Sequence, residues 1–309
     1  MKSLLLTGAS GFVGSNLYDA LHQDFEINGL DITKSGKIPV ERVFGWDELD
    51  LLPEFDAIIH LAGKAHDTSD TTNEKEYFDV NLGLTKKIFN HFLDSTAAKF
   101  IFFSSVKAVA DSVDEILTEY TVPNPKTAYG RSKLEAEQYI LSKSLPAHKS
   151  VYILRPCMIH GPGNKGNLNL LYKVVKKGIP WPLGAFENRR SFASIGNVSN
   201  VVRRLVEEHV PSGIYQLGDD ESLSTNELVT LIAESLDKKP SIWNLPKGLI
   251  VSLAEIGDLL HLPLNSERLK KLTESYVVSN KRIKDALAID RLPISSVEGL
   301  KQTLKSFSG

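Results

Sequence analysis

Three glycines, spaced three residues apart, follow the first apolar run of the chain and constrain its fold more than any other feature. Residues 4–6 are all leucine and predict a buried strand, and Gly8, Gly11 and Gly14 come directly after it. Glycine suits a turn that needs a positive φ or a close approach of two backbone segments. A helical pattern over residues 14–22 begins at the last glycine. We therefore predict a strand, a tight turn and a helix in immediate succession.

Short apolar runs and helical patterns continue to alternate along the first half of the chain. We predict strands at 26–30, 57–61, 100–103 and 151–154, and helices at 74–95 and 129–142. This alternation implies right-handed crossovers and a parallel sheet that is covered on both faces. We therefore predict an α/β fold, with a doubly wound, parallel Rossmann sheet in residues 1–158. Residues 159–309 should form a smaller C-terminal domain against the edge where the strands end, although later segments can return to the sheet.

The glycine turn brings backbone amides and a helix N-terminus to a place where a phosphate group can bind. Taken alone, the triplet fits a purely structural turn equally well. Asp31 ends the second strand, where a carboxylate can accept hydrogen bonds from the adenosine ribose and would repel a 2′-phosphate. An ordinary turn aspartate is the alternative, and Lys34 and Lys37 weaken the preference for NAD over NADP without reversing it. We predict that NAD is the cofactor, with Asp31 at its ribose and its pyrophosphate on Gly8, Gly11, Phe12, Val13 and Gly14.

Three further side chains predict acid–base chemistry on an alcohol. Tyr129 and Lys133 lie four residues apart on one face of a predicted helix, and Ser105 follows the strand at 100–103. A phenol with a pKa near ~10 is a poor base at neutral pH. The ammonium group of Lys133 and a positive nicotinamide ring should both lower the pKa of Tyr129. We predict that these three residues are catalytic, that Ser105 holds the substrate oxygen, and that Tyr129 and Lys133 also contact the cofactor.

Together these motifs resemble the extended short-chain dehydrogenase/reductases, and within them the NAD-dependent nucleotide-sugar epimerase/dehydratase group. The resemblance covers nearly the whole chain. Besides the features above, it rests on His60-Leu61-Ala62-Gly63, Val80-Asn81, Arg155-Pro156 and Gly161-Pro162-Gly163. It implies that the C-terminal domain binds a nucleotide sugar and that Leu61, Ala62 and Gly63 contact NAD. It also implies a homodimer formed through the helices at 74–95 and 129–142.

Several reactions are open to members of this group. Sugar 4,6-dehydratases carry an Asp-Glu pair directly after the hydroxyl residue, whereas this chain has Val106 and Lys107 there, so dehydration is not expected unless Asp111 or Asp114 replaces them. A 4-epimerase and a 4-keto reductase would both use Ser105. The surroundings of residues 161–167 resemble enzymes of bacterial polysaccharide gene clusters that act on UDP-N-acetyl sugars. We favour a 4-epimerase of a UDP-N-acetylhexosamine or UDP-hexose, with an NAD(P)H-dependent 4-keto reductase as the alternative and a non-catalytic NAD-binding regulator as a third hypothesis.

The resemblance also indicates residues for the substrate. Arg190 stands where the group has a diphosphate-binding arginine, and a guanidinium can bind two phosphate oxygens at once. Asn167 resembles a residue that contacts the diphosphate or the uridine. Arg268 is a weaker candidate for a second phosphate contact, and a helical surface charge is equally plausible there. His60 and His66 have no third ligand at metal spacing, so we expect no metal.

Composition limits the partners and the compartment. The chain of 309 residues has a formal charge of -2 and no basic stripe, so we expect no nucleic-acid partner. The N-terminal residues predict a strand rather than a signal peptide. The apolar run at 249–264 is interrupted by Glu255, Asp258 and His261 and is too short to span a bilayer, so we expect no membrane partner. Cys157 is the only cysteine, which excludes an internal disulfide and fits a cytoplasmic protein.

Overall fold

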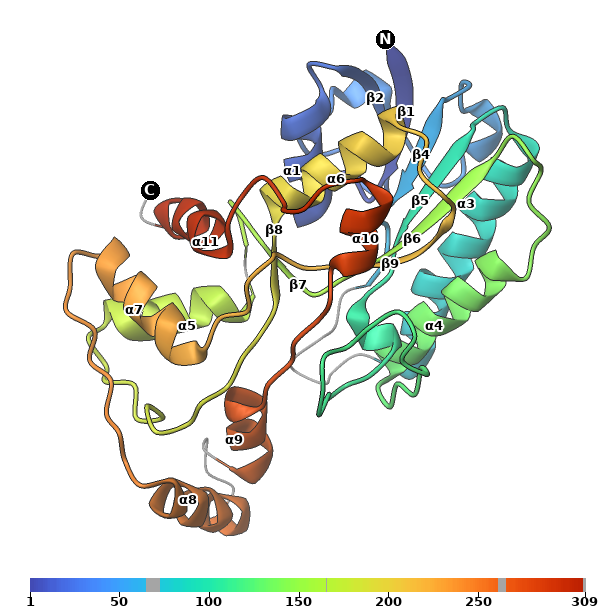
Figure 1. Ribbon diagram of the computed structural model, residues 1–309. Coiled ribbons are helices and arrows are strands. Elements are labelled where there is room, and N and C mark those ends of the chain that lie inside the picture. The colour runs from blue at the N-terminus through green and yellow to red at the C-terminus, as the bar shows by residue number, and fades with distance from the viewer. Residues whose placement is uncertain (65–72, 165, 261–264, 308–309) are drawn as a thin grey trace.

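The predicted Rossmann sheet forms the centre of the computed structural model, which describes residues 1–64, 73–164, 166–260 and 265–307 (Figure 1). In the described residues the sheet has seven parallel strands in the order β3-β2-β1-β4-β5-β6-β9. Their bounds are β1 (Lys2–Thr7), β2 (Phe25–Leu30), β3 (Val43–Phe44), β4 (Ala57–His60), β5 (Lys99–Phe103), β6 (Ser150–Pro156) and β9 (Gly213–Leu217). The strand order reverses between β1 and β4, and ligands bind beyond the carboxyl ends of strands at such a point.

Helices cover both faces of the sheet, as the alternating pattern predicts. On one face α1 (Phe12–Leu21), α6 (Ile195–Glu207) and α10 (Lys281–Ala286) close an apolar core, and on the other α3 (Gly83–Asp94) and α4 (Ala128–Leu141) close a second (Figure 1). The helix predicted at 74–95 is present but is not uniform. It consists of α2 (Glu74–Tyr77), a π-helical segment η3 (Phe78–Leu82) and α3. Its apolar spacing predicts a helix but does not distinguish one wide turn from an ordinary one.

The C-terminal part of the chain forms a smaller region with its own apolar core. It contains a parallel pair of short strands, β7 (Met158–His160) and β8 (Phe192–Ser194), and the helices α5 (Asn167–Lys176), α7 (Thr225–Ser235), α8 (Lys247–Leu260), α9 (Ser266–Thr273) and α11 (Ser296–Lys305). Residues 195–217 return to the sheet as α6 and β9. The apolar run at 249–264 forms α8 as far as Leu260, and its last four residues lie outside the described ones. No helix in the described parts of the chain has the length and apolarity needed to cross a bilayer.

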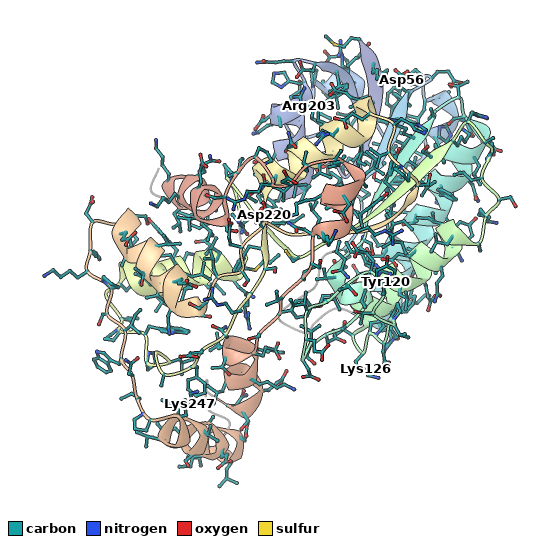
Figure 2. The ribbon with its side chains drawn as sticks, in the orientation of Figure 1. Asp56, Tyr120, Lys126, Arg203, Asp220 and Lys247 are labelled. Atoms are coloured by element: carbon teal, nitrogen blue, oxygen red, sulfur yellow. The ribbon has the colours of Figure 1, made fainter. Side chains whose placement is uncertain are left out.

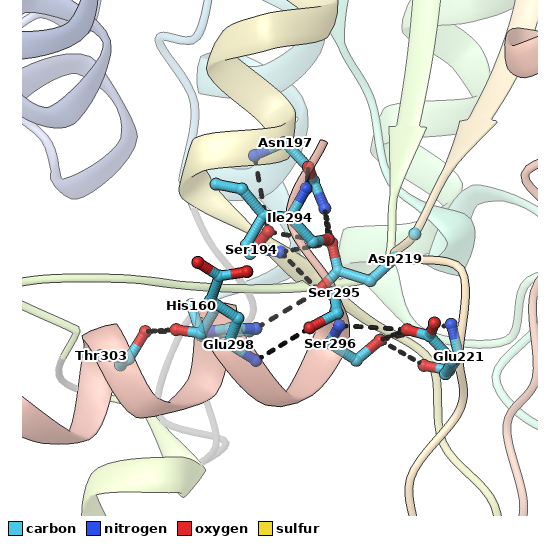
Figure 3. Close-up of polar contacts among 12 residues, drawn as sticks. His160, Ser194, Asn197, Asp219, Glu221, Ile294, Ser295, Ser296, Glu298 and Thr303 are labelled. Atoms are coloured by element: carbon cyan, nitrogen blue, oxygen red, sulfur yellow. Dashed lines mark hydrogen bonds and ion pairs between the residues drawn. The ribbon is translucent and has the colours of Figure 1, made fainter. Parts of the chain in front are cut away.

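A buried polar cluster joins this region to the sheet (Figure 3). Asp219, just after β9, accepts hydrogen bonds from the backbone N–H of Ser194 at 3.0 Å and from the amide of Asn197 at 2.7 Å. His160 on β7 bonds Thr303 of α11 at 2.8 Å, and its other ring nitrogen lies 3.6 Å from the Asp219 carboxylate. The cluster therefore ties β7, β8, α6 and α11 to the end of β9, an edge strand of the sheet.

A fully buried ion pair attaches α4 to the sheet. Arg155 on β6 donates to both carboxylate oxygens of Glu137 on α4, from Nε at 2.9 and 3.2 Å and from Nη2 at 2.5 Å. The hydroxyl of Ser104, at the end of β5, donates to the same carboxylate. Both charged side chains are almost completely excluded from solvent. Since an unpaired buried charge is costly, this pairing fixes α4 against two neighbouring strands.

We expect Glu137→Ala to lower the free energy of unfolding by about 3–5 kcal/mol, because Arg155 would remain buried and charged without its partner. The double variant Glu137→Leu with Arg155→Met removes both charges and should recover most of the loss. Urea unfolding followed by circular dichroism measures both. Glu135→Ala, an exposed position on the same helix, is the matched control and should change stability by less than about 0.5 kcal/mol. Equal effects at positions 135 and 137 would contradict this assignment.

Candidate active site

The glycine turn has the geometry of a phosphate cradle. Gly8 has a φ of 67°, and a Cβ added there would lie 2.8 Å from the backbone nitrogen of Ala62, after β4. A Cβ on Gly14 would lie 2.5 Å from the carbonyl oxygen of Gly8. Gly11 caps α1 without a side chain, so its N-terminal amides, with Phe12 and Val13 in the first turn, are not covered by a capping group. The positive end of a helix dipole at this place fits a pyrophosphate.

Asp31 is hydrogen-bonded to the glycine turn through Ser10. Its carboxylate is buried and accepts from the backbone N–H of Ser10 at 2.8 Å, from the Ser10 hydroxyl at 2.7 Å and from the backbone N–H of Ile32 at 2.7 Å. An ionised carboxylate has about four acceptor positions, so one is left for a ribose hydroxyl. Contact of Asp31 with the ribose stays a prediction. Lys34 and Lys37 form ion pairs with Glu48 and Asp19 instead.

A buried chain of hydrogen bonds holds the loop after β4 that contains Leu61, Ala62 and Gly63. The Thr85 hydroxyl donates to the carbonyl of Asn81 at 2.6 Å, so it accepts from His60 Nε2 at 2.9 Å. His60 Nδ1 therefore accepts from the Thr7 hydroxyl at 2.7 Å, and that hydroxyl accepts from the N–H of Ala62 at 3.0 Å. Burial, and then the charge of Lys133, lower the pKa of His60 well below its usual value, which keeps the ring neutral. His60 thus has a positioning role, and His66 lies outside the described residues.

The three predicted catalytic residues come together at the carboxyl end of β5. Ser105 hydrogen-bonds Tyr129, which lies in the first turn of α4. Lys133, one turn further along, donates from Nζ to the carbonyl of Phe103 at 2.9 Å. A Cβ on Gly63 would lie 3.1 Å from that Nζ, so the loop after β4 packs directly on Lys133. The loop predicted to contact the cofactor and the start of α4 therefore share one corner of the site.

The residues of the protein raise the pKa of the Tyr129 phenol, so the lowering expected from Lys133 is not seen, and the lowering expected from a nicotinamide ring stays a prediction. Burial is the main cause and outweighs the opposing hydrogen bond from Ser105. Burial also lowers the pKa of Lys133 to about 8, against the smaller effect of Glu137. The ammonium group of Lys133 donates to the carbonyl of Phe103. Burial of the Tyr129 phenol is the larger effect on its pKa. The residues of the protein alone therefore favour the neutral phenol.

The two residues after Ser105 begin the short 3₁₀ turn η4 (Val106–Ala108). Val106 is buried and has no group that transfers protons. The carboxylate of Asp111 accepts from the backbone N–H of Lys126 at 2.6 Å and from the Thr127 hydroxyl at 3.0 Å, so it holds the N-cap residue of α4, and Asp114 is exposed. Neither carboxylate replaces the Asp-Glu pair of a dehydratase.

Lys107 is a site residue for which we predicted no role. Its ammonium group donates to the carbonyl of Asp111 at 2.7 Å and lies 4.5 Å from the centre of the Tyr276 ring. Burial lowers the pKa of Lys107, and the charge of Arg190 lowers it further. Two cations therefore line the space between η4 and the segment after α9. In the sequence, the place of Lys107 two residues after Ser105 was the signal that could have identified it.

The three predicted substrate residues lie in different environments. Arg190, just before β8, donates to the carbonyls of Lys271 and Glu274 and so caps the C-terminal end of α9. Arg268 is exposed at the other end of that helix, and Asn167 is exposed at the start of α5. Of the three, Arg190 lies near enough to Lys107, two residues after Ser105, for its charge to lower the pKa of that lysine.

These features define an enzyme that binds a nicotinamide dinucleotide and moves a proton at an alcohol. The sequence pattern of the NAD dependent epimerase/dehydratase family matches residues 4–218. The chain belongs to this family, and NAD is its cofactor.

Individual relatives agree with this assignment. The chain is 29% identical to a UDP-glucose 4-epimerase of Vibrio cholerae, over 99% of this chain and 95% of the relative. It is 30% identical to an N-acetyl-alpha-D-glucosaminyl-diphospho-ditrans,octacis-undecaprenol 4-epimerase of Escherichia coli O157:H7, over 96% and 88%. Among solved structures, UDP-N-acetylglucosamine 4-epimerase from Bacillus cereus covers 100% of both chains with a TM-score of 0.78 and 18% identity, which shows a shared fold.

Gly8→Ala should weaken NAD binding about tenfold or more, because the added methyl group forces the turn away from Ala62. Gly178→Ala is the matched control, since Gly178 has a similar φ of 72° but nothing within 4 Å of an added Cβ. That variant should lose only about 1–2 kcal/mol of stability for its positive φ and bind NAD normally. Isothermal titration calorimetry and urea unfolding separate the two effects. Unchanged NAD affinity in Gly8→Ala would show that the turn is not the cradle.

Proposed function

We propose that the protein is a 4-epimerase of a sugar carried on a diphosphate, with UDP-N-acetylhexosamine or UDP-hexose as the substrate. The observation that carries the proposal is the corner formed by Ser105, Tyr129 and Lys133 beside the glycine turn, together with Val106 in place of an acid. Such a site can remove and return a proton at one hydroxyl group but has no group placed to eliminate water.

The chain supplies the proton chemistry. Ser105 donates to the C4 oxygen of the sugar, and Tyr129 Oη accepts the proton of the C4 hydroxyl as that carbon is oxidised. NAD, held by the glycine turn, would supply the acceptor and donor of a hydride at C4. The 4-keto sugar turns in the site, and Tyr129 gives its proton back to the oxygen as the opposite face of C4 is reduced. Lys133 contributes positive charge near the phenolate, which burial otherwise disfavours.

The surroundings of Asp31 favour an epimerase over a 4-keto reductase. A biosynthetic reductase commonly draws on NADPH, whose 2′-phosphate needs nearby cations. Lys34 and Lys37, the cations expected for that role, are paired with Glu48 and Asp19. The buried Asp31 carboxylate would repel a 2′-phosphate. The 4-keto reductase therefore remains the alternative, and the intact set of Ser105, Tyr129 and Lys133 disfavours a non-catalytic regulator.

Arg190 and Lys107 are the proposed contacts for the diphosphate. A guanidinium has five N–H donors, and two groups of Arg190 bond the end of α9, so further donors remain for phosphate oxygens. Asn164, at the loop before α5, adds a buried amide nitrogen with no hydrogen-bond partner in the described structure. We propose Asn164 as a further substrate contact beside Asn167, and Arg268 as a weaker one.

The carrier beyond the diphosphate is a separate question. The Vibrio cholerae relative is named for UDP-glucose and the Escherichia coli relative for an undecaprenol-linked sugar. We propose UDP as the carrier, with a polyprenyl diphosphate as the second candidate. A row of exposed apolar side chains on α8 favours the second candidate. We further propose a cytoplasmic homodimer that forms through α3 and α4.

Tyr129→Phe should lower kcat by about 10²–10⁴-fold while NAD binding is largely kept, because the variant loses only the proton-transfer group. Purified enzyme is incubated without added cofactor with UDP-N-acetylglucosamine, UDP-glucose or polyprenyl-diphospho-N-acetylglucosamine, and the C4 epimers are separated by chromatography. Tyr139→Phe is the control on the same helix, since its hydroxyl bonds Asn90 away from the site. Undiminished turnover in Tyr129→Phe would exclude the mechanism, and a need for added NADPH would favour the reductase.

A further inference from the structure

Helix α8 has two apolar faces, and only one of them is covered by the protein. Ile250, Ala254 and Gly257 are buried, and the first two belong to the C-terminal core. A second row consists of Leu249, Leu253, Ile256 and Leu260, spaced four, three and four residues apart along one line of the helix. These four side chains are 51, 45, 49 and 60% exposed. Hereafter they are called the α8 row.

Two further exposed apolar residues flank or interrupt the α8 row in the sequence. Trp243, a few residues before the helix, is 54% exposed, and Leu259 near its end is 79% exposed. Among the polar residues of the helix, Glu255 and Asp258 fall on the side away from the row, and Ser252 lies at its edge. A contiguous exposed apolar patch on a folded protein marks a surface that another body covers.

The charge around this surface differs from that of the rest of the chain. Residues 238–273 contain six lysines and arginines against three acidic residues, a net charge of +3, whereas the whole chain has -2. Lys247 stands at the start of α8 (Figure 2), and Lys270 and Lys271 are exposed on α9, which packs against α8. Basic residues beside an apolar helical stripe with a tryptophan are typical of a helix that lies in the surface of an anionic membrane.

We propose that α8 docks the protein on an anionic lipid surface, with the α8 row inserted among the lipid chains and the nearby lysines on the headgroups. The helix is only 14 residues long, so it lies on the bilayer and does not span it. A second copy of this chain fits the surface less well, because a two-fold contact sets each patch against its own copy and would bring the lysines together. The inference replaces the expectation of no membrane partner.

Docking through α8 would bring the substrate side of the enzyme near the membrane. Helix α9 packs on α8, and the C-terminal carbonyls of α9 bind Arg190, the proposed diphosphate contact. A membrane-bound enzyme of this shape can receive a sugar diphosphate from a lipid carrier. The inference goes beyond the proposed reaction and does not depend on it, since lipid binding and turnover are measured separately.

The test is co-sedimentation of the full chain with vesicles of phosphatidylcholine and phosphatidylglycerol (7:3), with pure phosphatidylcholine vesicles for comparison. We expect binding to the mixed vesicles that weakens at high salt, and a loss of about tenfold or more in affinity for Leu253→Gln/Ile256→Gln. Val251→Gln, on the opposite side of the same helix, is the control and should bind like the natural protein. Thermal unfolding and turnover of a soluble UDP-sugar should be unchanged in both variants.

Two outcomes would overturn the inference. One is that the protein binds neither kind of vesicle, or binds equally well when the α8 row is changed. The other is that the natural protein does not bind vesicles and that light scattering gives the row variant a lower molar mass than the natural protein. In that case a second copy of the chain covers α8. If the natural protein binds the mixed vesicles but does not turn over any sugar diphosphate, the proposed function is wrong and the lipid inference still holds.

Discussion

The buried pair of Glu137 and Arg155 is the interaction on which the geometry of the site depends. Tyr129, Lys133 and Glu137 recur at intervals of four on one face of α4, so fixing the carboxylate also fixes the two proposed catalytic groups on this helix. Arg155 holds that carboxylate against β6, and Ser104 holds it against β5, one residue before Ser105. The buried ion pair therefore fixes the separation between Ser105 and Tyr129.

The same burial that positions the catalytic groups also works against their ionised forms. It raises the pKa of Tyr129 and lowers that of Lys133, so the protein alone holds the phenol neutral. In the proposed mechanism, the positive charge of a nicotinamide ring would lower the pKa of Tyr129 again, so proton abstraction would depend on the oxidised cofactor. His60 is kept neutral by its burial and by Lys133, and so contributes hydrogen bonds rather than charge.

Local patterns predicted the fold well, because they depend on residues close in sequence. Alternating apolar runs located β1, β2, β4, β5 and β6 but not the two-residue β3, the glycine spacing located the turn at Gly8, and the interval from Tyr129 to Lys133 placed both on one helical face. Contacts between distant residues could not be found in this way. The bond from Ser10 to Asp31, the capping of α9 by Arg190 and the π-helical turn depend on how separate elements meet, and no local pattern encodes them.

The central claim is that the hydride taken from C4 of a sugar returns to C4 of the same sugar. The most direct test uses UDP-N-acetylglucosamine or UDP-glucose with deuterium at C4 and enzyme as purified, without added cofactor. Mass spectrometry and proton NMR then follow the label in the epimer that forms. The account predicts that the product keeps its deuterium at C4. A product with protium at C4, or no product until NADH or NADPH is added, would contradict it.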